Sequence, residues 1–320
     1  MGMIEELLHQ ILMEEKSDSR NPHSALIVHQ PVLVREVLEY LAPRSGQTIL
    51  DCTLGAGGHS VAILPRLLPG GRLIGVDRDA TALKRARLRL NEFEPQVRYL
   101  HANFSELPGA LAKPRLLPVD GLLADLGVSS VQLETPERGF SFLHEGPLDM
   151  RMDTSRGTTA AALLARLPER ELAELLWRYG EERLSRRIAK RIVMTRRLMP
   201  IQTTTQLARV IAEASPARAG ALRIHPATRT FQALRIAVND ELGSLRALLA
   251  ALPTLLRPGG RAVLIAFHSL EDRLIKHAFR RGAEDGWCRV LTKKLVGPSE
   301  GELEANPRAR SAKLRAIERI

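Results

Sequence analysis

The sequence predicts an α/β fold, in which a doubly wound, mostly parallel sheet carries an inserted helical domain. Three observations predict it: short apolar runs of strand length, helical patterns between the first four of these runs, and a long basic stretch of helical pattern that interrupts the alternation. The chain has 320 residues, which is enough for about two domains.

Five short runs have the near-continuous Ile, Leu and Val content of strands that are buried on both faces. They are Thr48–Cys52, Arg72–Asp77, Val97–Ala102, Val119–Asp125 and Arg261–Phe267. Between them, Ser60–Leu68 and Ala80–Leu90 have apolar residues at helical spacing. Right-handed crossovers place the carboxyl ends of parallel strands along one edge, where such sheets bind ligands.

The helical insertion follows the fourth strand. From about Glu134 to Phe231 the pattern is helical and basic, and a helix over Phe231–Leu256, closed by Pro258-Gly259-Gly260, leads to the fifth strand. Insertions at the ligand edge often carry substrate recognition. We therefore predict an N-terminal extension (1–28), the first part of the sheet domain (29–133), an inserted helical substrate-binding domain (134–231) and the second part of the sheet domain (232–320).

Composition narrows the class of protein. No run approaches the roughly 20 apolar residues of a membrane-spanning helix. The first 20 residues carry acids throughout, unlike a secretory signal or an Arg-rich transit peptide. Cys52 and Cys288 lie far apart, which excludes a disulfide scaffold and a cysteine-built zinc site. We expect a soluble cytoplasmic protein without a metal or a membrane partner, and the sequence leaves its oligomeric state open.

The net charge of +11 favours a polyanionic partner. Between Arg183 and Arg229 there are eleven Lys or Arg residues and one acid, Glu213. A solvated helix face is the alternative, but such faces normally mix charges of both signs. The residues that we expect to contact RNA phosphates are Arg186, Arg187, Lys190, Arg191 and Arg229.

A glycine-rich turn, Asp51–Ser60, follows the first strand and opens a helix, and Asp77 ends the second strand 20 residues after Gly57. An acid in that position accepts hydrogen bonds from ribose hydroxyls. The dinucleotide fingerprint G-x-G-x-x-G is incomplete, because position 60 is serine. Asp51 suits the amino group of a methionine moiety better than a pyrophosphate, so the turn favours S-adenosylmethionine (SAM). The alternative for Asp51 is a cap on the backbone amides of the turn.

The third and fourth strand ends add further candidates. Phe104 follows the third strand and could lie against an adenine, or else pack in the core. The turn Asp125–Ser130 places a carboxylate, a glycine and two hydroxyls at the ligand edge, with solvated turn residues as the alternative. His268 ends the fifth strand and is better explained as a structural or RNA-contacting residue than as a base.

With these motifs in place, the sequence resembles the RsmH (MraW) family, bacterial SAM-dependent methyltransferases that act on the N4 atom of a cytidine in small-subunit ribosomal RNA. The resemblance runs from about His29 to the C-terminus. It rests on Asp51–Ser60, Val76–Asp79, Asp125–Ser130 with Gln132, Glu137–Phe142, Gly146–Asp153, Tyr179–Arg183, His225–Gln232, Phe267–Asp272 and Asn306–Ser311.

The resemblance implies a Rossmann-like methyltransferase fold, SAM as the cofactor, and a specific cytidine in the decoding region of 16S rRNA as the substrate, within the small ribosomal subunit. By match to the family's motifs, the SAM contacts fall on Gly57, Gly58, His59, Asp77, Phe104, Asp125 and Gln132.

The implied chemistry needs acceptors for the hydrogens of the cytosine amine, because its lone pair is delocalised into the ring. We expect Asp125, Ser129 and Ser130, with the backbone carbonyls of their turn, to act as these acceptors. Phe140 and Phe142 could receive a base that has left its stack, or else pack in the core. Two other functions remain open: a nicotinamide-dependent oxidoreductase with the same glycine turn, and a non-catalytic RNA-binding or assembly factor.

Overall fold

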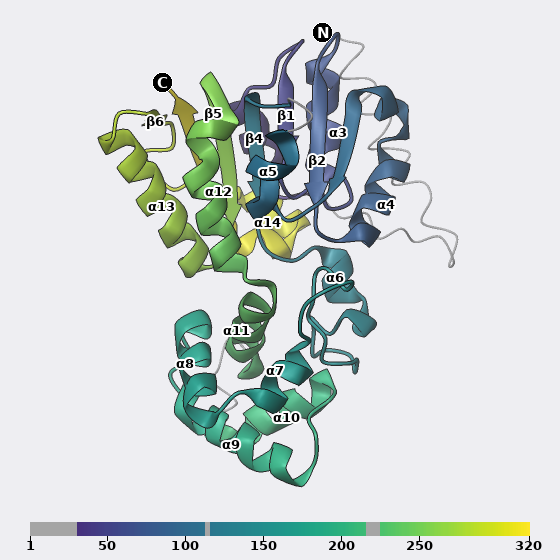
Figure 1. Cartoon of the computed structure of the whole chain (residues 1–320), viewed down its shortest axis with the longest axis vertical. Helices are drawn as coiled ribbons and strands as arrows, with labels where there is room; N and C mark the ends of the chain where they lie inside the picture. The colour runs from purple at the N-terminus through teal and green to yellow at the C-terminus, as the bar shows by residue number, and fades with distance from the viewer. Residues whose placement is uncertain (1–30, 113–115, 216–224) are drawn as a thin grey trace.

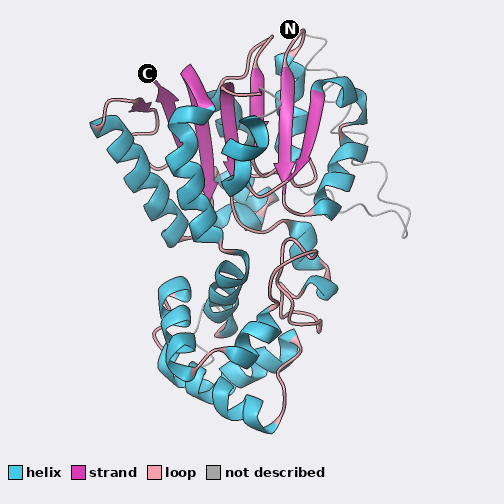
Figure 2. Ribbon diagram, viewed as in Figure 1, coloured by secondary structure: helices cyan, strands magenta, loops and turns pink. Residues whose placement is uncertain are grey.

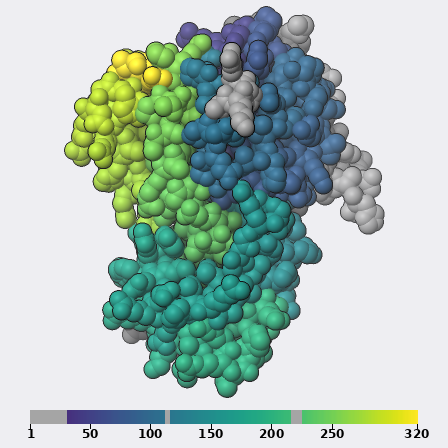
Figure 3. Space-filling view, in the orientation of Figure 1, coloured from purple at the N-terminus to yellow at the C-terminus, as the bar shows by residue number. Residues whose placement is uncertain are grey.

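The computed structural model describes residues 31–112, 116–215 and 225–320, and the predicted N-terminal extension lies outside them. The described chain forms two lobes (Figure 1). The sheet lobe contains the strands, and the helical lobe is formed by the helices of the segment inserted after Asp125. On the face shown in Figure 3, the two lobes meet without a gap.

The sheet has seven strands in the order β3-β2-β1-β4-β5-β7-β6 within the described residues (Figure 2). The strands are β1 Thr48–Asp51, β2 Arg72–Asp77, β3 Val97–His101, β4 Val119–Asp125, β5 Leu256–Ala266, β6 Cys288–Val290 and β7 Lys313–Arg319. The first five are parallel, and β7 pairs antiparallel with both β5 and β6. The prediction of a doubly wound, mostly parallel, Rossmann-like sheet is confirmed.

Helices cover both faces of the sheet, as its apolar strands require. Apolar residues of α2, α3 and α4 form a core on one face, and residues of α5, α12 and α13 form a core on the other. These helices and the short ones beside them are α2 Val34–Leu41, α3 Gly58–Leu67, α4 Ala80–Arg89, η1 Asn91–Gln96, η2 Phe104–Glu106, α5 Leu107–Ala112, α12 Glu241–Leu255, α13 Ser269–Glu284, α14 Glu300–Ala305 and η5 Pro307–Ser311.

The chain between β4 and α12 leaves the sheet and forms the helical lobe. Its elements are α6 Ser130–Glu134, η3 Pro136–Arg138, α7 Ala160–Arg166, α8 Glu169–Gly180, α9 Ser185–Leu198, α10 Thr204–Ala214 and α11 Ala227–Asn239. The lobe has its own apolar core, which extends along α11 through Phe231 and Leu234, with Val238 packed against it. The exact domain boundaries stay a prediction.

The single helix expected over Phe231–Leu256 is wrong: two helices, α11 and α12, meet at Asp240. Asp240 has left-handed backbone angles, φ 44° and ψ 46°, a conformation that Asp tolerates better than most residues. The break lets α11 bury its apolar side in the helical lobe while α12 packs on the sheet.

The last part of the sheet also differs from the expectation. Strand β5 begins at Leu256, five residues before the predicted Arg261, and a register irregularity opposite Val119 and Gly121 accommodates the extra length. Strands β6 and β7 were not predicted. No helix among the described residues is long and apolar enough to cross a membrane.

Candidate active site

A cavity lies at the carboxyl edge of the parallel strands, where β1 has β2 on one side and β4 on the other. This is the point at which open α/β sheets bind ligands. Its volume is about 340 Å³, and both lobes contribute to its wall. The sequence-predicted residues that line it are Gly58, His59, Asp77, Phe104, Asp125, Ser129, Ser130 and Gln132.

The glycine turn forms one wall of the cavity. Gly57 caps α3 with φ 82°, a left-handed conformation that favours glycine. A Cβ at Gly57 would meet the Leu90 side chain at 3.2 Å, and one at Gly58 would meet Pro31 at 3.2 Å. Gly57 does not itself line the cavity. The two glycines therefore let the turn pack tightly against the protein while Gly58 presents its backbone to the cavity.

Asp77 ends β2 with its carboxylate at the cavity wall. One oxygen accepts from the Gly55 N–H and the other from the Asp79 N–H, both at 2.8 Å. Burial raises the pKa of Asp77, although these two hydrogen bonds oppose the rise. Each carboxylate oxygen has more than one lone pair, so the group can still accept from ligand hydroxyls.

Asp51 lies beneath the glycine turn and does not line the cavity. Its carboxylate accepts from the Thr53 N–H at 3.1 Å and from Ser60 Oγ at 2.8 Å. This is the capping arrangement that the sequence left open as the alternative. Burial raises the pKa of Asp51 to about 6.

Asp125 ends β4, and its side chain lines the cavity. Its Oδ1 is closed to solvent and has no hydrogen-bond partner among the described residues, and its Oδ2 lies 3.7 Å from His59 Nδ1. Burial raises the pKa of Asp125 well above its usual range, and the charges of Asp51 and Glu271 add to the rise. His59 is turned partly away, because its Nε2 donates to the Val32 carbonyl at 2.8 Å.

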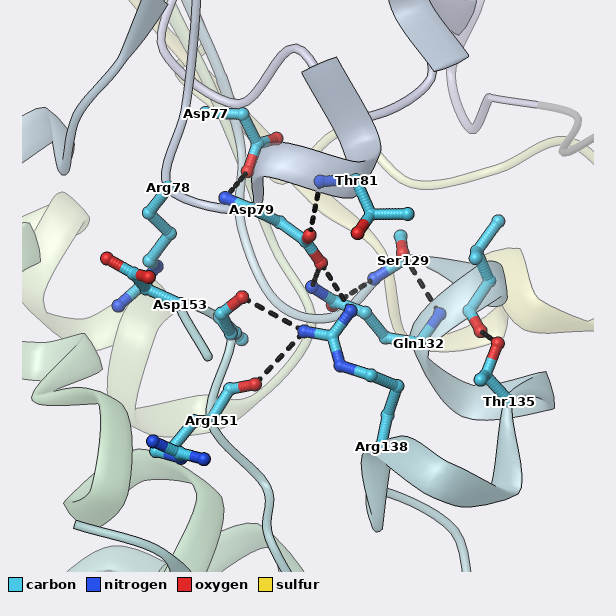
Figure 4. Close-up of polar contacts among 12 residues, drawn as sticks. Asp77, Arg78, Asp79, Thr81, Ser129, Gln132, Thr135, Arg138, Arg151 and Asp153 are labelled. Carbon is cyan, nitrogen blue, oxygen red and sulfur yellow. Dashed lines mark hydrogen bonds and ion pairs between the residues drawn. The ribbon is translucent and has the colours of Figure 1, made fainter. Parts of the chain in front are cut away.

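Ser129 and Gln132 are joined in a capping box at the start of α6. Gln132 Oε1 accepts from the Ser129 N–H at 3.1 Å, and Ser129 Oγ accepts from the Gln132 N–H at 3.2 Å. Gln132 Nε2 donates to the buried carboxylate of Asp79 at 2.9 Å. Arg138 reaches the same oxygen of Asp79 (Figure 4). The amide of Gln132 is thus held by the protein at the cavity wall.

Phe104 is nearly buried, but one part of its ring lines the cavity. The Arg78 guanidinium lies 5.8 Å from the ring centre. Phe104 therefore packs in the core, as one of the two interpretations expects, and it also lines the cavity; its contact with an adenine stays a prediction.

A buried ion pair that the sequence analysis did not predict lies where α11 meets α12. Arg235 donates from Nε and Nη2 to the two oxygens of Glu241, each at 2.8 Å, and both residues line the cavity with Glu271. No sequence signal indicates this pair, because it depends on the break at Asp240.

Within the described residues, Glu241, His268 and Glu271 offer ligand atoms within 4.8 Å of one another. Both Glu241 oxygens already accept from Arg235. His268 caps α13, with Nδ1 accepting from the Glu271 N–H at 3.4 Å and Nε2 at 3.2 Å from Glu271 Oε1. The acids are therefore balanced by neighbouring basic groups, and His268 has a structural role.

Phe140 and Phe142 belong to the helical lobe's apolar core and do not line the cavity. The Phe142 ring lies 4.6 Å from the His225 ring and 4.9 Å from the Phe231 ring. Core packing, the alternative given for these residues, describes both of them in this structure.

The predicted phosphate-binding residues lie apart from the cavity. Arg186, Arg187, Lys190 and Arg191 are exposed on α9, at the end of the helical lobe remote from the sheet (Figure 1). Arg191 pairs with Glu213 of α10. Arg229 is exposed on α11 and donates to the Glu181 carbonyl at 3.3 Å.

Comparisons with known proteins show the family to which this chain belongs. Ribosomal RNA small subunit methyltransferase H of Sorangium cellulosum is 54% identical over 91% of this chain and 91% of its own length. The protein of that name from Geobacter sulfurreducens is 52% identical over 91% of this chain and 99% of its own length. A solved SAM-dependent O-methyltransferase from Thermotoga maritima covers 92% of this chain and 68% of its own, at 10% identity and a TM-score of 0.40. The model of the MraW methylase family matches residues 26–320, and the chain belongs to that family.

Proposed function

We propose that this protein transfers the methyl group of SAM to the N4 amine of a cytidine in the decoding region of 16S rRNA, within the small ribosomal subunit and in the cytoplasm. The observation that carries the proposal is the cavity at the point between β1 and β4, where a glycine turn, two carboxylates and an aromatic ring meet. Membership of a methylase family supports the reaction, and the names of the relatives support the substrate.

The residues of the cavity fit SAM part by part. Asp77 has lone pairs left for the ribose hydroxyls, and the Phe104 ring offers a face to the adenine. The Gly58 backbone borders the space for the methionine part. The Asp125 side chain lines the cavity, its buried Oδ1 accepts from no described residue, and a carboxylate favours the positive sulfonium. The cavity volume of about 340 Å³ is within the range of small-molecule sites.

When bound, SAM supplies an activated methyl group on a positively charged sulfur. The task of the protein is to hold the cytosine amine in line with it, and such positioning can contribute about 7–11 kcal/mol. Transfer would form the N–C bond as the C–S bond breaks, would leave S-adenosylhomocysteine, and would release one proton from the amine to Asp125 or to solvent. Asp125 is suited to accept a hydrogen bond from the amine, and its raised pKa makes it a better proton acceptor than an exposed carboxylate.

Ser129 and Ser130 lie on the wall next to Asp125. The hydroxyl of Ser129 keeps lone-pair capacity beyond its bond to the Gln132 N–H, so it can accept the second amine hydrogen. An RNA substrate that reaches this cavity also passes the helical lobe, where the exposed basic residues of α9 would contact phosphates.

Calorimetry separates this proposal from the nicotinamide-dependent alternative. We expect SAM and its demethylated product, S-adenosylhomocysteine (SAH), to bind and to raise the melting temperature, and NAD to do neither. Binding of NAD in place of SAM would contradict the proposal.

A further inference from the structure

The three residues after the main part of β2, Asp77, Arg78 and Asp79, connect the cavity to the helical lobe. Asp77 faces the cavity, and its carboxylate accepts from the Asp79 N–H at 2.8 Å. Arg78 and Asp79 each bind a residue of the inserted segment or of α11. The ribose side of the cavity and the attachment of the helical lobe therefore share one short segment of backbone.

Asp79 is the centre of a buried polar cluster (Figure 4). Its Oδ1 caps α4 by accepting from the Thr81 N–H at 3.0 Å. Its Oδ2 accepts from Gln132 Nε2 at 2.9 Å and from Arg138 Nη1 at 2.7 Å. The side chains of Asp79 and Arg138 are only 7% and 14% exposed, so solvent weakens this ion pair little.

Arg138 carries the connection onward into the helical lobe. Its Nη2 donates to the carbonyls of Arg151 and Met152, at 3.0 and 2.9 Å. One planar guanidinium thus joins a carboxylate of the sheet lobe to two backbone carbonyls of the insertion. A lysine has the charge but not this fork of donors.

Asn239, the last residue of α11, holds the same loop from the other side. Its amide donates to the Met150 carbonyl at 2.7 Å and accepts from the Met152 N–H at 2.8 Å. Its own carbonyl accepts from Arg78 Nη1 at 2.8 Å. The loop 150–152 is therefore held by two contacts that both return to the segment after β2.

The loop is under backbone strain and belongs to the helical lobe's core. Met150 has φ 64°, an unfavourable left-handed conformation for a long side chain, and it persists only where surrounding contacts hold it. The side chains of Met150 and Met152 are buried in the apolar core of that lobe. The orientation of the loop is thus tied to the orientation of the lobe.

We propose that Arg138 is a positioning residue that couples SAM binding to RNA binding. Ribose hydroxyls on Asp77 fix the carboxylate that holds the Asp79 backbone, and the pair of Asp79 with Arg138 then keeps the loop 150–152 and the helical lobe in the arrangement that binds RNA. Coupling of this kind is reciprocal, so bound RNA raises the affinity for SAM by the same factor. The inference rests on the proposed function, because it assumes SAM in the cavity and RNA on the helical lobe.

The test measures the affinity of the full chain for small ribosomal subunits from cells that lack this enzyme, with and without saturating SAH, which cannot react. We expect SAH to raise the affinity of the unaltered protein by about fivefold or more. In Arg138→Lys the same ratio falls close to one when SAH is again present at saturation for that variant. Because Arg138 also lines the cavity, the affinity of each variant for SAH alone is measured first. A variant that still binds SAH and the subunits but has lost the ratio has lost the coupling and not the fold.

Arg273→Gln is the matched control. Arg273 of α13 pairs with Glu181 after α8, so this ion pair also joins the two lobes, but neither residue lines the cavity. The ratio should persist in this variant. If Arg138→Lys does not fold, Asn239→Ala, which frees the loop from its other side, should lower the same ratio.

Two results would overturn the inference: a ratio of one in the unaltered protein, or a ratio unchanged in both Arg138→Lys and Asn239→Ala. Failure of the proposed function has a different signature, since the unaltered protein then fails to bind SAH or the ribosomal subunits at all.

Discussion

Three carboxylates lie at the carboxyl edge of the sheet, those of Asp51, Asp77 and Asp125. They differ in their hydrogen-bond partners, and the partners indicate the role of each carboxylate. Asp51 is satisfied by the turn beneath which it lies, and Asp77 holds two backbone N–H groups. Only Asp125 keeps a buried oxygen without a protein partner. A cationic ligand in the cavity therefore gains most from Asp125, and the other two keep the turn and the strand end in place.

The raised pKa values predict a pH dependence for SAM binding. Burial favours the protonated forms of Asp51, with a pKa of about 6, and of Asp125. Lowering the pH from about 7 to about 5, through the pKa of Asp51, protonates Asp51, and Asp125 takes up its proton at a higher pH than an ordinary carboxyl. Both changes remove negative charge that attracts the sulfonium, by up to about tenfold in affinity per pH unit for each proton taken up. Calorimetry across this range measures the effect.

SAH is the control for this prediction, because its sulfur is neutral. Its affinity should change less with pH, and Asp125→Asn should flatten the curve for SAM. Parallel curves for SAM and SAH would contradict the role of Asp125.

Asp77→Ala should weaken SAM binding about 10- to 150-fold, the equivalent of about 1.5–3 kcal/mol for the missing hydrogen bonds to a charged acceptor. Asp120→Ala is the matched control: Asp120 also accepts from a backbone N–H, that of Thr48, but at the opposite edge of the sheet. Equal reductions of SAM affinity in the two variants, measured by calorimetry, would refute the assignment of Asp77.

The exposed basic face of the amphipathic helix α9 is expected to bind RNA phosphates, and mutation of this face tests that expectation. Its buried residues Ile188 and Ile192 pack in the helical lobe, which leaves Arg186, Arg187 and Lys190 exposed. Replacing these three residues by serine should lower the affinity for RNA. The slope of the logarithm of the association constant against the logarithm of the salt concentration should become shallower by about 0.7–0.9 for each phosphate that the variant no longer neutralises. SAM binding should persist.

Arg191→Ser serves as the comparison, because Arg191 is already paired with Glu213. Arg191→Ser should change the salt dependence of RNA binding less than a serine substitution at Arg187, for which the described residues show no ion pair. An unaltered slope in the triple variant would show that RNA does not use this face of α9.

Strands can be predicted from the sequence where a run of apolar residues has a single explanation, burial within the sheet. The first four strands match their predicted ranges to within a residue. Strands β1, β2 and β4 are buried on both faces and so are almost continuously apolar, whereas the edge strand β3 is only partly buried and still has Val97, Tyr99 and Leu100.

Strand β7 was not predicted from the sequence, because Lys313 and Arg315 alternate with buried Leu314 and Ala316 and the stretch resembles a basic tail. Asp272 compensates these charges, and nothing local in the sequence shows that contact.

The same limit applies to the site. The strand-end residues Asp77 and Asp125 could be found from the sequence, because parallel strands place their carboxyl ends together. The cavity residues Arg138 and Arg235 could not, because each depends on a contact between segments far apart or on the break at Asp240.

At the scale of the whole molecule, the two lobes divide the work of the proposed reaction. The sheet lobe offers the methyl donor a rigid edge, and the helical lobe carries exposed positive charge that suits RNA phosphates. Phosphate contacts position a protein without choosing a base. Under the proposed function, the choice of cytidine would therefore fall to the cavity between Asp125 and Ser130.

Methyl transfer from SAM to ribosomal RNA is the decisive measurement for the proposed function. Small ribosomal subunits from a strain that lacks this enzyme are incubated with the protein and methyl-labelled SAM, and the nucleosides of the 16S rRNA are then identified by mass spectrometry. We expect label on the N4 atom of one cytidine in the decoding region. With Asp125→Ala we expect no label in the 16S rRNA. No incorporation, or label on another atom, would contradict it.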